Sequence, residues 1–97
     1  MKRHYVYILS SQRNGTLYVG STSDLIKRVF EHKNKLVFGF TAKYNVSRLV
    51  YFEEHESYLE AARREKRLKN WCRQWMLNLI EEKNPHCEDH ILLTPLP

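Results

Sequence analysis

The sequence predicts an α+β domain in which a small three-stranded antiparallel sheet is flanked by helices, in the order ββαβαα. Two short segments rich in β-forming residues, 5–9 and 17–20, flank the dipeptide Asn14-Gly15, which is typical of a hairpin. A third segment of this kind covers residues 47–54. The segments that follow the second and third strands carry apolar residues at helical spacing, so helices are expected there.

The first strand places Tyr5 and Tyr7 on one face, because side chains alternate along a strand with a period of two. The second strand runs back beside it and carries Tyr18, which we expect near Tyr7. As core residues, these tyrosines need partners for their hydroxyls. As site residues, they can donate to or accept from a phosphate or a water molecule.

The first helix is expected from about Asp24 to Lys33, with the Ser and Thr side chains of 21–23 as N-cap candidates. Asp24, Arg28 and His32 are four residues apart, so they stack in one column beside the apolar face. A surface ladder of charges explains this column as well as a functional site does. The apolar face itself is expected to hold Leu25, Ile26, Val29 and Phe30.

Residues 34–45 are expected to form an irregular connection. A long helix follows the third strand, from about Ser57, an N-cap residue in a capping-box pattern, to about Asn70. A last helix covers about 73–82 and ends before the Asn-Pro pair at 84–85.

One carboxylate interrupts the apolar stripe of the long helix. Glu65 falls in the middle of this stripe, where burial is costly unless the carboxylate is paired or binds a cation. Two interpretations therefore remain, a buried ion pair with a neighbouring arginine and a metal ligand in a cleft. The stripe consists of Tyr58, Ala61, Ala62 and Leu68.

Length and composition indicate one globular domain. The chain has 97 residues, of which 42% are hydrophobic and 28% charged. We expect residues 1–85 to form the domain and 86–97 a C-terminal tail. No apolar run approaches the roughly 20 residues of a membrane span, and the N-terminus lacks a signal-peptide pattern, so a cytoplasmic protein without a membrane partner is expected.

The cysteines and the charge restrict the compartment and the partners. Cys72 and Cys87 are too few for a disulfide framework, so both are expected to be reduced thiols. The net charge of +5 favours an anionic partner, with nucleic acid first. Many small proteins are mildly basic, so charge alone does not decide the function.

The motifs taken together resemble the GIY-YIG nuclease domain, and in particular the small stand-alone bacterial proteins of that family. The similarity begins with "YVY" at 5–7 and "YVG" at 18–20, where Tyr5 replaces the first glycine of the motif. No chemistry is expected of that position, and Gly20 keeps the backbone freedom of the second triplet. The resemblance covers nearly the whole chain, continuing through 22–32, 40–44, 49–54, 60–71 and 79–85.

This resemblance implies an endonuclease that hydrolyses phosphodiester bonds in DNA with one Mg²⁺ or Mn²⁺ ion. Glu65 would be the metal ligand, since a lone carboxylate suits a hard cation that is otherwise bound by water and phosphate oxygens. Arg28 would bind the scissile phosphate, and His32 would orient Arg28, the phosphate or the attacking water. Tyr7 and Tyr18 would position that water. Tyr7 would help to deprotonate it, which requires nearby positive charge because a free tyrosine has a pKa of about 10.

Substrate binding is expected to involve basic side chains outside this group. The candidates are Lys43, in the aromatic and basic segment 38–44, together with Arg63, Arg67 and Lys69 on the long helix. The basic face of that helix is equally compatible with a solvated surface. No base-reading element is evident, so weak sequence specificity or structure-directed recognition is expected.

Two hypotheses compete with the nuclease. A nucleic-acid-binding module of the same fold would cut little or not at all, but it has no need of Glu65, Arg28 and Tyr7. An interaction protein would use Trp71, Trp75 and the C-terminal tail in a dimer contact. The expected assembly is a monomer or a weak homodimer.

Three possible zinc ligands lie beyond the end of the last helix, and a fourth follows the third strand. They are His86, Cys87 and His90, with His55 as the fourth. The spacing is not that of a standard tetrahedral site, so a surface tail is the preferred interpretation.

Overall fold

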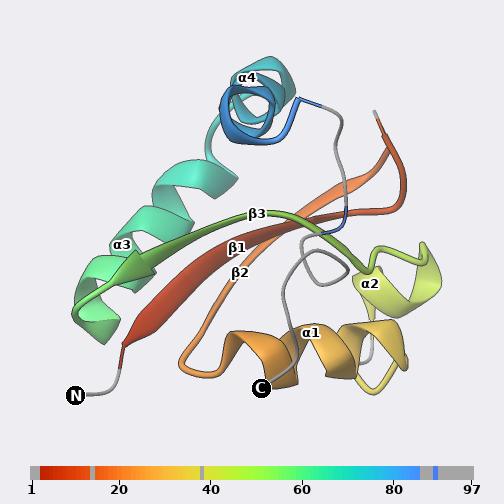
Figure 1. Cartoon of the computed structure of the whole chain (residues 1–97), viewed down its shortest axis with the longest axis horizontal. Helices are drawn as coiled ribbons and strands as arrows, with labels where there is room; N and C mark the ends of the chain where they lie inside the picture. Colours follow the sequence, from red (N-terminus) through yellow and green to blue (C-terminus); the bar gives the residue numbers. More distant parts are fainter. Residues whose placement is uncertain (1–2, 14, 38, 86–88, 90–97) are drawn as a thin grey trace.

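A three-stranded sheet and four helices make up the part of the chain that the computed structural model describes, residues 3–13, 15–37, 39–85 and 89 (Figure 1). The predicted α+β class and antiparallel three-stranded sheet are confirmed. The strands are β1 (His4–Ser10), β2 (Leu17–Thr22) and β3 (Arg48–His55), and the helices are α1 (Leu25–Lys33), α2 (Phe40–Lys43), α3 (Tyr58–Lys69) and α4 (Arg73–Lys83).

The first strand lies at the centre of the sheet, whose order is β2-β1-β3 with both pairings antiparallel. Tyr7 on β1 lies opposite Gly20 on β2 and Phe52 on β3. The register shifts between Ile8 and Leu9 against β3. Because β2 is an edge strand, groups from both faces of the sheet can meet around it.

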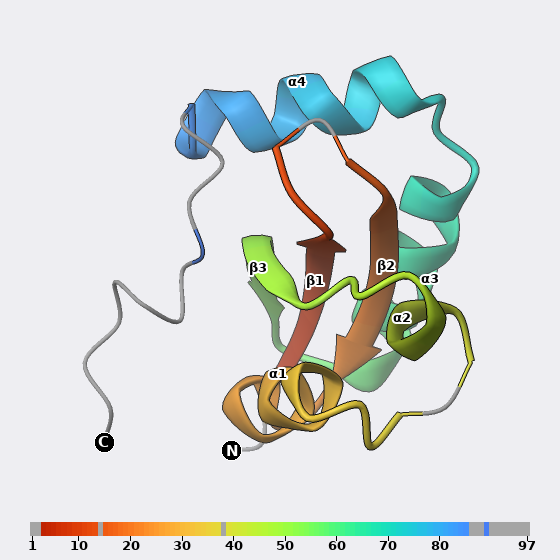
Figure 2. The ribbon, with the colours of Figure 1, turned by 90° about the vertical axis from the view of Figure 1, so that its right-hand side faces the viewer.

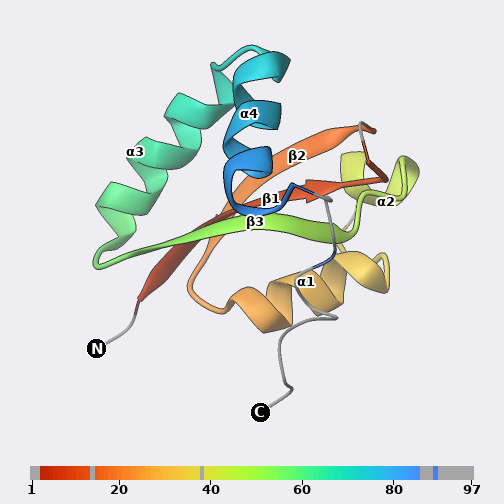
Figure 3. The ribbon, with the colours of Figure 1, turned by 45° about the horizontal axis from the view of Figure 1, so that its top comes forward.

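The helices cover both faces of the sheet, with α1 and α2 on one side and α3 and α4 on the other (Figures 1, 2 and 3). The alternation along β1 divides the core accordingly. Tyr7 and Leu9 pack with Val29 of α1, whereas Val6 and Ile8 pack toward α3 and α4. The central strand thus connects two small cores, and Tyr7 belongs to the one on the α1 side.

The start of α1 differs from the prediction in its cap. Asp24 is the N-cap residue, and its side chain accepts a hydrogen bond from the Lys27 amide at 3.2 Å. Thr22 accepts from the Asp24 amide through its hydroxyl at 3.1 Å, so it supports the cap without being the cap. At the start of α3, the predicted cap is confirmed, since Ser57 Oγ accepts from the Glu60 amide at 3.2 Å.

The predicted orientation of α1 is wrong by part of a turn. Phe30 is 60% exposed and Ile26 is also exposed, whereas Val29 and His32 are buried. The helix thus turns the Arg28–His32 side toward the sheet. Burial of His32 becomes tolerable because both of its ring nitrogens find partners.

The connection between α1 and β3 contains a short helix that the sequence reading missed. α2 follows Gly39, whose φ of 105° suits glycine, and it holds Thr41 in a buried position. Val46 closes the segment by donating its amide hydrogen to the Thr41 carbonyl at 2.9 Å. Residues 34–45 therefore are not a plain loop, because this turn of helix is fixed against the site.

The predicted C-terminal tail lies almost entirely outside the described residues, including its zinc-ligand candidates and Cys87. Asp89 is the described member, and its carboxylate accepts from the Leu49 amide at 3.2 Å and pairs with Lys33. Cys72 is exposed with a free thiol. None of the described helices is both long enough and apolar enough to cross a membrane.

Candidate active site

The phenol of Tyr7 lies over Gly20, and this contact explains the glycine. A Cβ at position 20 would lie 2.5 Å from the Tyr7 hydroxyl and 2.6 Å from Cζ. Gly20 is in β2 and is not among the described residues with positive φ, so backbone freedom is not its role here. Its missing side chain lets the phenol reach across β2 from the central strand.

We expect Gly20→Ala to destabilise the protein by about 1–3 kcal/mol, the usual cost of overpacking a close contact. The buried phenol would have to leave its place, because the contact involves the ring carbon as well as the hydroxyl. Urea unfolding measures the loss. The same substitution in a Tyr7→Leu background should cost much less. An equal cost in both backgrounds would show that the phenol is not the cause.

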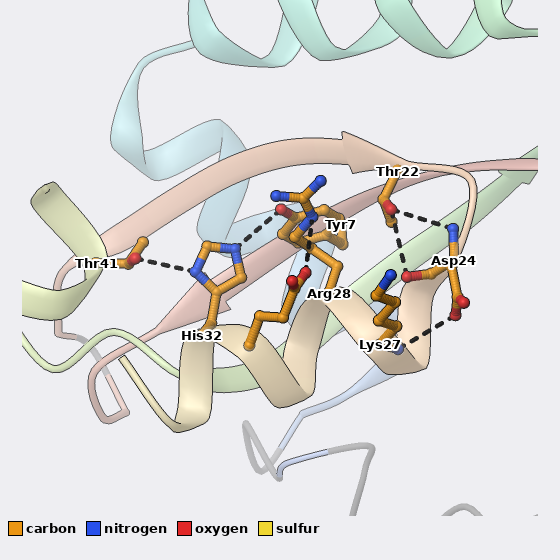
Figure 4. Close-up of polar contacts among 8 residues, drawn as sticks. Tyr7, Thr22, Asp24, Lys27, Arg28, His32 and Thr41 are labelled. Carbon is orange, nitrogen blue, oxygen red and sulfur yellow. Dashed lines mark hydrogen bonds and ion pairs between the residues drawn. The ribbon is translucent and has the colours of Figure 1, made fainter. Parts of the chain in front are cut away.

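His32 links Tyr7 to the short helix α2. Its Nε2 lies 3.1 Å from the Tyr7 hydroxyl and its Nδ1 lies 2.9 Å from Thr41 Oγ1 (Figure 4). Tyr7 and His32 are each 2% exposed, and Thr41 is also buried. The result is a short buried chain of polar groups that runs from β1 through α1 to α2.

The surroundings shift the pKa values of the two ionisable groups in this chain, Tyr7 and His32. Burial and the nearby Tyr18 raise the pKa of the Tyr7 phenol, although Arg28 opposes them. Burial and the positive charge of Arg28 lower the pKa of His32, with Glu31 acting against them. At neutral pH the phenol is therefore protonated and the imidazole neutral. One ring nitrogen of a neutral imidazole donates and the other accepts, so the two hydroxyls, of Tyr7 and Thr41, can satisfy both nitrogens.

Arg28 points from α1 toward the same region as Tyr7 and His32 (Figure 4). Its Nε lies 3.7 Å from Glu31 Oε1, and its side chain is about two-fifths exposed, at 42%. It also lines a polar cavity of about 170 Å³ with Thr22, Lys27 and Glu31. A guanidinium in this position can bind an anion from solvent with more than one N–H.

Glu65 reaches the site from the other side of the edge strand. Its Oε1 accepts from Ser21 Oγ at 2.5 Å, and its Oε2 lies 2.6 Å from Lys69 Nζ. Burial alone would raise the pKa of Glu65, but the hydrogen bonds from Lys69 and Ser21 outweigh it and lower the pKa. The carboxylate is therefore ionised, and its ion-pair partner is a lysine of its own helix and not an arginine.

The five predicted catalytic residues come together around β2. The Tyr18 ring lies 6.4 Å from Tyr7 and 5.5 Å from His32, between ring centroids, which confirms the expected proximity of the tyrosines. The charges of Arg28 and Glu65 both act on the Tyr7 phenol, so the carboxylate is within electrostatic reach of the α1 side. Among the residues described, there is no cluster of three or more His, Cys, Asp or Glu side chains that could hold a metal.

The predicted nucleic-acid-binding residues differ in their relation to this group, because Lys69 contacts its carboxylate directly. Arg63 and Arg67 are exposed on α3. Lys69 pairs with Glu65, and Lys43 lies over the Tyr44 ring at 5.4 Å. Two other basic residues have partners within the protein. Arg64 donates to the Glu53 carboxylate, and Arg73 donates to the Gly15 carbonyl.

Two site residues escaped the sequence analysis. Ser21 holds Glu65, and Thr41 holds His32. Ser21 follows the "YVG" triplet directly, so its place on an edge strand could have suggested it. Thr41 carried no local signal, because its role depends on a contact with a helix nine residues earlier in the chain.

Comparison with known protein families identifies the family of this chain. The model of the GIY-YIG catalytic domain matches residues 3–78, which is most of the chain. This range includes β1, β2, α1 and α3, and therefore all five residues grouped around the edge strand.

Several bacterial proteins are similar over nearly their full length. The UPF0213 protein of Staphylococcus saprophyticus is 40% identical over 86 residues, which cover 84% of this chain and 99% of the relative. A UPF0213 protein of Staphylococcus aureus is 39% identical, over 86% of this chain and 100% of the relative. The solution structure of a UPF0213 protein from Bacillus halodurans superimposes with a TM-score of 0.56 at 30% identity, over 97% of this chain and 99% of that one. These names state no activity.

Proposed function

Because this chain belongs to the GIY-YIG catalytic domain family, a family of nucleases, we propose that it is a metal-dependent endonuclease that hydrolyses phosphodiester bonds in DNA. Recognition would be structure-directed or weakly sequence-specific, since the described fold has no separate base-reading element. We further propose that it acts in the cytoplasm, as a monomer or a weak homodimer.

One observation carries the proposal. The buried hydroxyl of Tyr7 lies 3.1 Å from Nε2 of a neutral histidine, at the same edge strand that has an exposed guanidinium on one side and an ionised carboxylate on the other. Hydrolysis of a phosphodiester needs a proton acceptor, a cation for the phosphate and an anion that can hold a metal.

The proton acceptor would be a pair of residues. Tyr7 would take a proton from the attacking water on its hydroxyl oxygen while its own proton passes to His32 Nε2, 3.1 Å away. The tautomer that this requires has its proton on Nδ1, which would donate to Thr41 Oγ1, 2.9 Å away, so that Thr41 keeps the imidazole oriented. Because the phenol never has to exist as a free phenolate, its raised pKa is compatible with this role.

Arg28 would bind the scissile phosphate. Its exposed guanidinium can donate to two phosphate oxygens and stabilise the charge that develops on them during attack. Glu31 holds the side chain near this position through the 3.7 Å ion pair. Tyr18, next to both Tyr7 and His32, would help to position the water.

The residues at Glu65 suit a hard divalent ion such as Mg²⁺ or Mn²⁺. The carboxylate is ionised, and Ser21 fixes one oxygen while Lys69, a half-exposed and flexible side chain, holds the other. A single carboxylate fits an ion that keeps most of its waters and takes the rest of its ligands from phosphate. Such an ion would supply a Lewis acid at the phosphate.

The proposal is tested by cleavage of end-labelled single-stranded, duplex, flap and branched DNA, and of RNA, with Mg²⁺, Mn²⁺ or EDTA. We expect cleavage that requires the metal and falls about 10²–10³-fold in Arg28→Ala, because one transition-state donor is lost. Arg63→Ala removes an exposed cation of α3 and serves as the matched control, with a small uniform loss of affinity.

A nucleic-acid-binding module of the same fold remains the second candidate, and the Glu65–Lys69 ion pair favours it. A carboxylate that only stabilises α3 would make this same contact. No cleavage of any substrate, with equal binding by the parent and Arg28→Ala, would support the binding module.

A further inference from the structure

Three aromatic rings form a row that leads from the candidate active site to the surface. Tyr18 and Phe40 are stacked, with centroids 6.4 Å apart and an interplanar angle of 25°. Phe40 and Tyr44 follow at 4.9 Å. The inner end of the row touches His32, because the Tyr18 ring lies 5.5 Å from the imidazole. The row therefore connects exposed surface directly with the residues assigned to catalysis.

The outer two rings are not needed to hold α2 in place. Phe40 is 46% exposed and Tyr44 is 48% exposed, and neither belongs to the core on this side of the sheet. The helix is anchored instead by Thr41, through His32, and by fully buried Val46. Two large apolar rings thus keep about half of their surface in water at the edge of the site, where a ligand would cover them.

The charge around the row is suited to an anion. From Lys33 to Arg48 the sequence contains no acidic residue. Lys43 holds its ammonium 5.4 Å from the centroid of the Tyr44 ring. A flat π surface beside a mobile cation is the combination that binds a nucleobase together with its phosphate.

We propose that Phe40 and Tyr44 form a stacking platform for an unpaired base next to the scissile phosphate, with Lys43 on the neighbouring phosphate. This inference rests on the proposed function and specifies its substrate. Bases inside a duplex already stack on each other and do not offer their faces. The preferred substrate would therefore be a strand, or a junction or flap, with unpaired nucleotides beside the bond that is cut.

Binding in EDTA tests the platform without cleavage. The probes are 12-nucleotide single strands of DNA and of RNA with one 2-aminopurine, whose fluorescence falls on stacking, and a blunt DNA duplex of the same sequence. The parent protein should quench the single strands and bind them more tightly than the duplex. Phe40→Ala and Tyr44→Ala should each weaken single-strand binding about 5- to 100-fold, the range that follows from loss of one base–aromatic stack, and leave duplex binding unchanged.

The controls separate stacking from folding and from catalysis. Phe30→Ala removes a still more exposed aromatic ring on the solvent side of α1 and should change nothing. Tyr44→Phe should bind like the parent, whereas Tyr44→Leu should behave like Tyr44→Ala. Thermal unfolding of each variant shows that the fold is kept.

Three outcomes would overturn the platform. The parent could bind the duplex as tightly as the single strands, or Phe40→Ala and Tyr44→Ala could lose the same affinity for the duplex as for the single strands. The third is that the parent does not quench the 2-aminopurine fluorescence. A failure of the nuclease proposal looks different, because metal-dependent cleavage would be absent while Phe40→Ala and Tyr44→Ala still lose single-strand binding. Stronger quenching of the DNA or of the RNA probe identifies which nucleic acid the platform takes.

Discussion

Glu65→Gln is expected to lower the cleavage rate by about 10³-fold or more while the protein stays folded. The carboxylate would hold the metal ion, whose contribution to the transition state is several kcal/mol, and each 1.4 kcal/mol corresponds to about a factor of ten in rate. The amide of glutamine can still accept from Ser21, so the contact to β2 survives. What disappears is the negative charge that faces Lys69.

The stability of Glu65→Gln should change by less than about 1 kcal/mol, because an i,i+4 ion pair with a half-exposed lysine contributes little. Urea unfolding measures this change, and Mn²⁺ titration followed by electron paramagnetic resonance measures loss of the ion. Glu81→Gln, an exposed glutamate of α4, serves as the control and should match the parent in all three measurements. A Glu65→Gln protein that cuts at the parent rate, or that loses nucleic-acid binding in EDTA, would contradict the assignment.

The strands and the long helices could be predicted from the sequence because their signals are local. The segments 5–9 and 17–20 alternate and are joined by one short connection, so they pair as a hairpin. Ser57 marks the start of a helix, because its side chain accepts a hydrogen bond from an amide three residues later. The position of Tyr18 near Tyr7 follows from the same alternation. These features depend on residues close in sequence, so they can be predicted from a single sequence.

The features that the sequence did not reveal all depend on distant contacts. The apolar pattern of α1 points to Phe30 as a core residue, yet the helix buries His32 because Tyr7 and Thr41 satisfy the imidazole. α2 forms where Gly39 turns the chain toward the site. The buried face of α3 is likewise narrower than the predicted apolar stripe, since Tyr58 is exposed. Hydrophobic periodicity cannot report a polar partner on another element.

The assembly of the site depends on the edge strand. Groups from α1 lie on one side of β2 and Glu65 lies on the other, and only an edge strand allows both to act on Tyr7. Gly20 removes the one side chain that would block the phenol, and Ser21, its neighbour, points to Glu65 instead. Successive residues of one strand thus serve the two halves of the site, as alternation requires.

Tyr7→Phe should reduce the cleavage rate about 10²–10⁴-fold, the usual contribution of a general base, with nucleic-acid binding in EDTA unchanged. The ring stays in the space above Gly20, and only the hydroxyl that lies 3.1 Å from His32 Nε2 is lost. Leaving that nitrogen without its partner should cost about 1–3 kcal/mol of stability, measured by urea unfolding. Glycine at position 20 makes the substitution free of steric strain.

If the proton passes from Tyr7 to His32, the two residues act as one unit. His32→Gln should then slow cleavage by a similar factor, and the double variant Tyr7→Phe/His32→Gln should be little worse than either single one. The imidazole must be neutral to accept a proton, and burial with Arg28 lowers its pKa although Glu31 opposes them. Activity of the parent should therefore fall only when the pH drops below about 6.5, the ordinary value for histidine. That acid limb should vanish in His32→Gln. Losses that multiply in the double variant, with the acid limb intact, would assign the two side chains to separate tasks and leave Tyr7 without its proton acceptor.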